Sequence, residues 1–186
     1  DDDVDDGDQS YAIAFSPTTS SDTNYSGITP ANIPITNLDN DIAGIAVGAI
    51  SGTTSEGGVG ATFTVVLESE PTANVTVSFS SSDPGEGTLS STSLLFTAAD
   101  WDTVRTVTVT GVDDDLDDGD IAYQVTFAAS TSTDTNYAGN TPAPVDVINV
   151  DDDVAGISVS AASGATSESG ASATFTVVLD SEPTAN

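Results

Sequence analysis

The 186-residue sequence contains no cysteine and no histidine, and its single basic residue is Arg105, so lysine is absent as well. Without thiolates and imidazoles the chain forms no disulfide and none of the usual zinc or copper sites. It also cannot assemble a Ser-His-Asp or Cys-His arrangement or a lysine Schiff base. We therefore expect that the protein is not an enzyme.

Positive charge is almost missing. The 30 acidic side chains leave a formal net charge of −29 at pH 7. A phosphate backbone would be repelled by such a chain, which excludes nucleic acid as a partner.

Long apolar runs are missing too. No stretch approaches the roughly 20 residues that span a bilayer, and the first residues, DDDVDDGD, lack the basic and apolar regions of a signal peptide. We therefore expect no membrane span in this window. The sequence begins in the middle of a repeat, so an export signal or a membrane anchor could lie outside it.

An internal repeat dominates what is present. A shift of 112 residues aligns 1–74 with 113–186 without a gap, and 46 of the 74 positions are identical. The segment DDDVDDGD returns as DDDLDDGD at 113–120, and ATFTVVL at 61–67 returns near the carboxyl end. The repeating module is therefore 112 residues long.

Acidic clusters mark the predicted module boundaries, because charged linkers commonly separate compact cores. NLDND ends at residue 41 and NVDDD ends at residue 153. We therefore predict a complete module at 42–153, the back end of a preceding module at 1–41 and the front end of a following one at 154–186. Each flank alone would expose open sheet edges. Either the window belongs to a longer ordered chain, or neighbouring copies complete the flanks by exchanging strands.

The fold class predicted for the module is all-β. Short runs of β-branched and aromatic residues alternate with turn signals, and no segment has a convincing helical period. Seven strands are expected, at 44–49, 61–67, 74–80, 93–98, 103–112, 122–128 and 143–150. Alternation assigns the core-facing side chains to Phe63, Val65, Leu67, Val75, Val77, Phe79, Val107, Val109, Tyr123, Val125 and Phe127. Their neighbours are largely Thr, Ser and Gln, which is typical of an antiparallel sandwich with one face of each sheet in water.

Several motifs follow one another in the order found in a known family. An SEGG bend at 55–58 precedes the strand ATFTVVL, then comes FTAADWDTVRTVTVTGVDDDLDDGD at 96–120, and a last strand ends in DDD. This order closely resembles the Calx-beta domains of sodium/calcium exchangers and large bacterial surface proteins. The resemblance implies tandem seven-stranded, immunoglobulin-like β-sandwiches that bind Ca²⁺ in the loops at one tip.

The resemblance also implies the metal ligands, position by position. They are the carboxylates of Glu56, Asp83, Asp113, Asp114, Asp118, Asp151, Asp152 and Asp153, together with the main-chain carbonyl of Leu116. Many bacterial members have a different segment where this chain has SSSDPGEG, so Glu86 is an alternative to Asp83.

The acidic residues indicate a metal site independently of the family resemblance. Seventeen of the 24 aspartates lie in four short clusters, at 1–8, 39–41, 113–120 and 151–153. Two carboxylates roughly 4 Å apart repel by about 1 kcal/mol in bulk water and by about 4 kcal/mol near a protein surface. Calcium, with six to eight oxygen ligands in flexible geometry, relieves that repulsion. The alternative is that acidity only solvates the surface, as in proteins adapted to high salt, but the polar strand faces carry Thr and Ser instead.

The functional prediction is a calcium-binding structural repeat of a secreted or surface-attached bacterial protein. Ions at the module junctions would stiffen a stalk or filament, with adjacent modules and other copies of the chain as partners. A first alternative is an adhesive module for a carbohydrate or a protein receptor. Such a module should expose aromatic side chains in its loops, and only Trp101 is a candidate, although packing on its own module explains that indole more simply. A glycosidase with paired carboxylates is disfavoured because the acids recur in each repeat.

Overall fold

A computed structural model describes residues 2–185, and all regular structure in that range is β-strand. Nine strands lie in the middle of the chain: β3 (Ile45–Val47), β4 (Thr54–Ser55), β5 (Gly60–Leu67), β6 (Val75–Ser81), β7 (Gly87–Leu89), β8 (Ser93–Phe96), β9 (Arg105–Gly111), β10 (Ile121–Phe127) and β11 (Val145–Val150). The flanks contain β1 (Gln9–Ile13) and β2 (Ile33–Asn37) before them, and β12 (Ile157–Val159) and β13 (Val177–Leu179) after them. The prediction of an all-β chain is confirmed.

The nine central strands form two sheets. One has the order β4-β11-β10-β6-β8 and the other the order β3-β5-β9-β7. All neighbours are antiparallel except β4 and β11, which run parallel. Apolar side chains from both sheets form one buried cluster, in which the rings of Phe63 and Phe127 meet edge to face at 6.1 Å. The two sheets therefore enclose a common core.

Each side chain assigned to the core by alternation is buried, and none is more than 9% exposed. On β5 the burial pattern alternates residue by residue, because successive side chains of a strand point to opposite faces. Trp101 packs against the core cluster from outside, as expected. Arg105 forms an ion pair with Asp100 at 2.5 Å.

Two short strands were not predicted. The first predicted strand, at 44–49, is limited to β3, after which the chain crosses to the other sheet as β4. The chain crosses again after β6, where β7 adds an edge to the sheet of β9. Gly87 begins β7, where any Cβ would lie 2.1 Å from the hydroxyl of Tyr123. Segments of two and three residues are too short to give a periodic signal, so alternation could not find them.

The loop after β10 is anchored by a buried tyrosine. Tyr137, 1% exposed, donates its hydroxyl to the carbonyl of Ser69 at 2.6 Å and accepts from the main-chain N–H of Ser69 at 3.0 Å. Asp134 forms the preceding turn, since its side chain accepts the N–H groups of Thr72 and Asn136. These contacts join the loop after β10 to the loop after β5.

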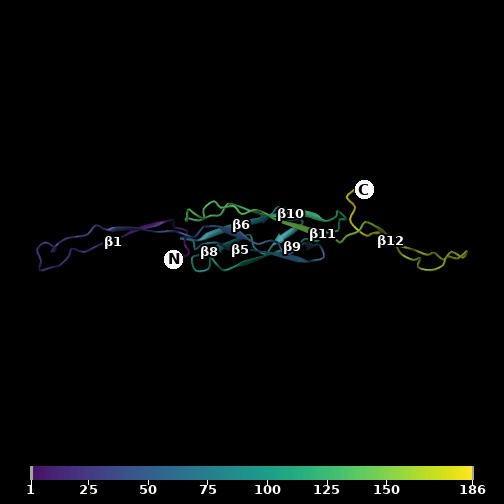
Figure 1. Cartoon of the computed structure of the whole chain (residues 1–186). Helices are drawn as coiled ribbons and strands as arrows, with labels where there is room; N and C mark the ends of the chain where they lie inside the picture. The colour runs from purple at the N-terminus through teal and green to yellow at the C-terminus, as the bar shows by residue number, and fades with distance from the viewer. Residues whose placement is uncertain (1, 186) are drawn as a thin grey trace.

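The flanks are two-stranded hairpins that extend from opposite ends of the central sheets (Figure 1). By the 112-residue repeat, β1 and β2 correspond to β10 and β11, whereas β12 and β13 correspond to β3 and β5. Their apolar faces are open: Phe175 is 64% exposed, whereas its equivalent Phe63 is 1% exposed. Equivalent side chains of the repeat are therefore buried where strands of an opposite sheet cover them and solvent-exposed where no such strands lie over them.

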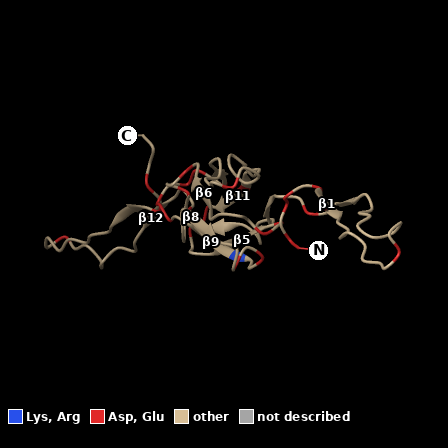
Figure 2. Cartoon of the chain, turned by 90° about the vertical axis from the view of Figure 1, so that its left-hand side faces the viewer, with Lys and Arg blue, Asp and Glu red and all other residues tan. Residues whose placement is uncertain are grey.

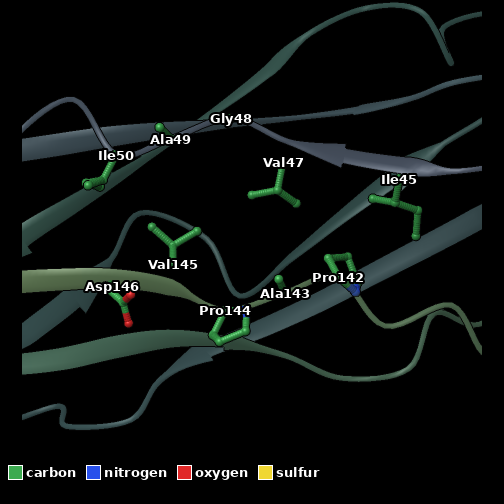
Figure 3. A pocket seen from close by; sticks show the side chains of 10 residues that line it. All are labelled: Ile45, Val47, Gly48, Ala49, Ile50, Pro142, Ala143, Pro144, Val145 and Asp146. Carbon is green, nitrogen blue, oxygen red and sulfur yellow. The ribbon is translucent and has the colours of Figure 1, made fainter.

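A groove of about 530 Å³ lies between β3 and β11, along the open side of the two sheets (Figure 3). Its walls are apolar, with Ile45 and Val47 on one side and Pro142 and Pro144 on the other. Of the ten described residues that line it, only Asp146 is ionisable. The described part of the chain also contains no helix long and apolar enough to cross a membrane.

Candidate metal centre

Strand pairing brings four acidic segments to one tip of the central sheets. β4 runs parallel to β11, with Ser55 opposite Val150, so Glu56 and Asp151 leave the sheet side by side. On the other sheet the start of β7 pairs with the end of β9, and the N–H of Val112 donates to the carbonyl of Glu86 at 3.0 Å. The residue that precedes β7 therefore lies beside the acidic loop that follows β9.

Glu56 reaches this tip because the chain crosses between the two sheets: β3 stays on the sheet of β5, and β4 passes to the opposite sheet before the bend at Glu56. The parallel pairing of β4 with β11 sets the distance to the last acidic cluster.

The first carboxylate cluster consists of Glu56, Asp151 and Asp153. One oxygen of each lies within 4.8 Å of the others. Glu56 is 5% exposed, and its Oε2 accepts the N–H of Asp152 at 3.4 Å. A nearly buried carboxylate between two others is costly unless a proton or a cation is present.

The second carboxylate cluster consists of Glu86, Asp114 and Asp118, with the same limit of 4.8 Å between oxygens. Glu86 is 9% exposed, and its Oε2 accepts the side-chain amide of Asn149 at 3.3 Å. Asp114 also accepts the N–H of Leu116 at 2.8 Å, which holds the start of the loop in a tight turn.

A buried polar network supports both clusters from below. Thr54 donates to Oδ1 of Asn149 at 3.0 Å, and Asn149 donates to the carbonyl of Val112 at 3.0 Å. The hydroxyl of Tyr123 lies 3.3 Å from that of Thr54. Thr54 and Asn149 are at most 1% exposed, so their hydrogen bonds are shielded from water. This network fixes the strand ends from which the carboxylates project.

The electrostatics of the first cluster reflect its burial. Burial raises the pKa of Glu56 to about 7, and the charges of Asp151 and Asp114 add to the rise. The pKa of Asp151 is lowered, chiefly by hydrogen bonds from the N–H groups of Asp153 and Gly119. The pKa of Asp153 is raised by burial and then by its acidic neighbours. Near neutral pH a proton on Glu56 therefore partly relieves the repulsion, and a cation could replace it.

The second cluster behaves in the same way. Burial raises the pKa of Glu86, opposed by the amide of Asn149, and the charges of Asp118, Asp83 and Asp114 raise it further. Asp114 acts on both buried glutamates, since its charge raises the pKa of each. The two clusters are therefore parts of one acidic tip.

The other predicted ligands, Asp83, Asp113, Leu116 and Asp152, are not members of either cluster. Asp152 has an oxygen 3.0 Å from the position of a Cβ on Gly57, beside the Glu56 bend. Asp113 is exposed, and Leu116 follows within the same loop. Asp83 uses its side chain to accept the N–H of Gly85 at 3.0 Å, while Glu86 occupies the cluster.

Sequence reasoning missed Thr54 and Asn149. A signal was available, because both are identical in the repeat, as Thr166 and Asn37. Asn149 also has the parity of the buried residues Val145 and Val147 on β11. A polar residue at a core-facing position beside acidic residues indicates a buried network.

Acidic residues gather at both ends of the central sheets, where the flanks join (Figure 2). Each described cluster contains only oxygen ligands, which are the ligands of calcium and magnesium rather than of zinc or copper. The three carboxylates of each cluster could bind a metal ion. Three carboxylates exceed the one or two that magnesium usually takes.

Comparisons with known proteins place the chain in no family. No protein-family model matches the sequence, and no curated protein matches it. Among solved structures, the chain is similar to the one titled "Crystal structure of the S-layer protein SbsC domains 4 and 5", at 20% identity and a TM-score of 0.36. The similarity covers 65% of this chain and 58% of that one, so the chain spans a little over half the length of the matched structure.

Proposed function

We propose that the chain is a section of a tandem array of calcium-binding modules with a structural role outside the cell. The observation that carries this proposal is the convergence of six carboxylates, from four separate segments, in two clusters at one tip. Glu56 and Glu86 are nearly buried there, which a protein without a cation or proton at the site would not tolerate well.

We further propose that the modules are Calx-beta-like, immunoglobulin-like β-sandwiches, and that 42–153 is the complete one. The antiparallel order of the two central sheets and the acidic tip are consistent with that resemblance. The exposed faces of the flanks support the assignment of 1–41 and 154–186 to neighbouring modules. In the proposed site, the two carboxylate clusters provide most ligands, with Asp113, Asp152 and the carbonyl of Leu116 around them.

A structural role fits the position of the acidic tip, because the segment at 151–153 both closes the site and leads into the next hairpin. A bound ion would hold this segment against the loop after β9, and a row of such junctions would form a stiff stalk or filament. Lateral contacts between chains in such a filament are part of the same proposal. An adhesive role has less support, since Trp101 packs against the core cluster rather than standing free in a loop.

Thermal unfolding of the full chain in calcium and in EDTA, at constant moderate salt, tests the metal proposal. An ion present at 100 times its dissociation constant stabilises the folded state by about 2.7 kcal/mol. For a domain of this size that corresponds to roughly 10 °C in melting temperature. Magnesium at the same concentration is the control and should give a smaller shift. Equal melting temperatures in calcium and EDTA would reject the metal site and favour the salt-adaptation alternative.

A further inference from the structure

The acidic loop after β9 touches the flank that follows it, through residues not included in either carboxylate cluster. The N–H of Glu182 donates to the main-chain carbonyl of Asp115 at 2.6 Å. The N–H of Ala155 donates to Oδ2 of Asp117 at 2.7 Å. Both donors belong to the carboxyl-terminal flank, so these bonds join the central sheets to the next hairpin.

The same two bonds recur at the other end of the molecule, 112 residues earlier. The N–H of Glu70 donates to the carbonyl of Asp3 at 2.6 Å, and the N–H of Ala43 donates to Oδ2 of Asp5 at 2.8 Å. Here the acidic loop belongs to the amino-terminal flank and the donors to the central module. The side-chain amide of Asn136 adds a bond of 2.5 Å to the carbonyl of Asp5. One contact pattern therefore holds both junctions.

Different aspartates of the loop contact different partners. Asp114 and Asp118 contribute to the second carboxylate cluster, whereas Asp115 and Asp117 reach the following hairpin. The loop is also bound to the strand before the junction, because the N–H of Gly119 donates to Oδ2 of Asp151 at 2.7 Å. The equivalent bond from Gly7 to Asp39, at 2.6 Å, holds the first loop in the same way. The bond to Asp151 or Asp39 therefore fixes one side of each loop, and the other side contacts the module that follows.

We propose that this second side of each acidic loop, made by the carbonyl of Asp3 or Asp115 and the carboxylate of Asp5 or Asp117, is a docking surface for the following module. The partner is recognised by two main-chain N–H groups, at Ala43 and Glu70 or at their repeats Ala155 and Glu182. This inference rests on the module boundaries proposed above, but not on calcium binding.

Two hydrogen bonds of each loop set the position and the direction of the following module. A carboxylate is a strong acceptor for an N–H group, and such charge-assisted bonds are shorter and stronger than neutral ones. Two bonds from separate segments of the partner, one near residue 43 and one near residue 70, fix its direction as well as its position. Successive modules therefore take a set orientation, which ions bound on the other side of the loop would reinforce.

Amide hydrogen exchange measured by NMR on the full chain tests this surface. The double variant Asp5→Ala with Asp117→Ala removes both carboxylate acceptors. Exchange of the Ala43 and Ala155 amides should then accelerate by about tenfold or more, because each loses its acceptor. The amide shifts of β9 and β10 report whether the central sheets stay intact.

The matched control is the double variant Asp3→Ala with Asp115→Ala. It removes the same charge from the same loops but leaves the carboxylates of Asp5 and Asp117, which accept the Ala43 and Ala155 amides, so exchange at these two amides should change by less than about twofold. Equal acceleration in the two double variants, or unprotected Ala43 and Ala155 amides in the parent chain, would overturn the proposal.

Orientation can be measured independently, because the absence of cysteine allows clean spin labelling. Labels at Thr108→Cys on β9 and Ser158→Cys on β12 should give a narrow distance distribution that broadens in the Asp117→Ala background and stays narrow in the Asp115→Ala background. A distribution equally broad in all backgrounds would contradict a docked junction. Both experiments are run in EDTA and in calcium, so a failure of calcium binding is seen separately from a failure of docking.

Discussion

Replacing Tyr137 by phenylalanine should destabilise the central module through a single hydroxyl group. That hydroxyl donates to the carbonyl of Ser69 at 2.6 Å and accepts from the N–H of Ser69 at 3.0 Å. The hydroxyl oxygen of Ser69 also lies 2.9 Å from the hydroxyl oxygen of Tyr137. Ser69 is 0% exposed, so water cannot replace these bonds. A buried polar group left without a partner costs about 1 to 3 kcal/mol, and here three contacts are lost at one site. We expect a loss of about 2 to 3 kcal/mol.

Urea unfolding followed by the fluorescence of Trp101, the only tryptophan, measures this change. With a denaturant dependence of about 1.5 to 2 kcal/mol per molar, the midpoint should fall by roughly 1 to 2 M. Tyr25→Phe is the matched control, since Tyr25 is the repeat equivalent and is 64% exposed. It should change stability by less than about 0.5 kcal/mol. Similar shifts in both variants, or a shift below about 0.5 kcal/mol for Tyr137→Phe, would refute this reasoning.

Three further predictions concern the tip and the core. In EDTA, the free energy of unfolding should fall as pH rises from about 4.5 to about 7, because the raised pKa of Glu56 means that the folded state binds the proton more tightly than the unfolded state. Melting curves of Glu56→Gln should lack this part of the pH dependence. An unchanged pH dependence in Glu56→Gln would contradict this prediction. Glu86→Gln should weaken calcium binding in calorimetry by about tenfold, whereas Asp83→Asn should have little effect; the reverse order would assign the site to Asp83. Phe63→Ala should cost about 3 to 5 kcal/mol in urea unfolding and Phe175→Ala almost nothing; equal costs would mean that the flank is covered.

The core was predictable because alternation has one physical cause. A strand with one face in the core must alternate, and β5 and β6 do so along most of their length. The ends and crossings of strands were less predictable. β4 owes its place to a parallel pairing with β11, a contact between residues about 95 positions apart that no local pattern encodes.

The candidate site was predictable in its residue types and less so in its members. Clustered aspartates indicated a metal site, and the family resemblance added Glu56 and the position at one tip. The structure brings Glu56, Asp151 and Asp153 together in one cluster, and Asp114 and Asp118 in the other. The place of Glu86 depends on β7, a three-residue strand that brings it beside the end of β9. The division of the acidic loop into Asp114 and Asp118 at the cluster and Asp115 and Asp117 at the junction could not be read from sequence, because all four residues are aspartates.

Calcium titration by calorimetry, on the full chain freed of metal, tests the central claim most directly. The parent chain should take up calcium with saturation, and the double variant Asp114→Asn with Asp151→Asn should lose at least one bound ion or about tenfold in affinity. The double variant Asp102→Asn with Asp146→Asn carries the same change of charge away from the tip and should bind as the parent does. Absence of saturable binding in the parent chain, or identical titrations for all three proteins, would contradict the account.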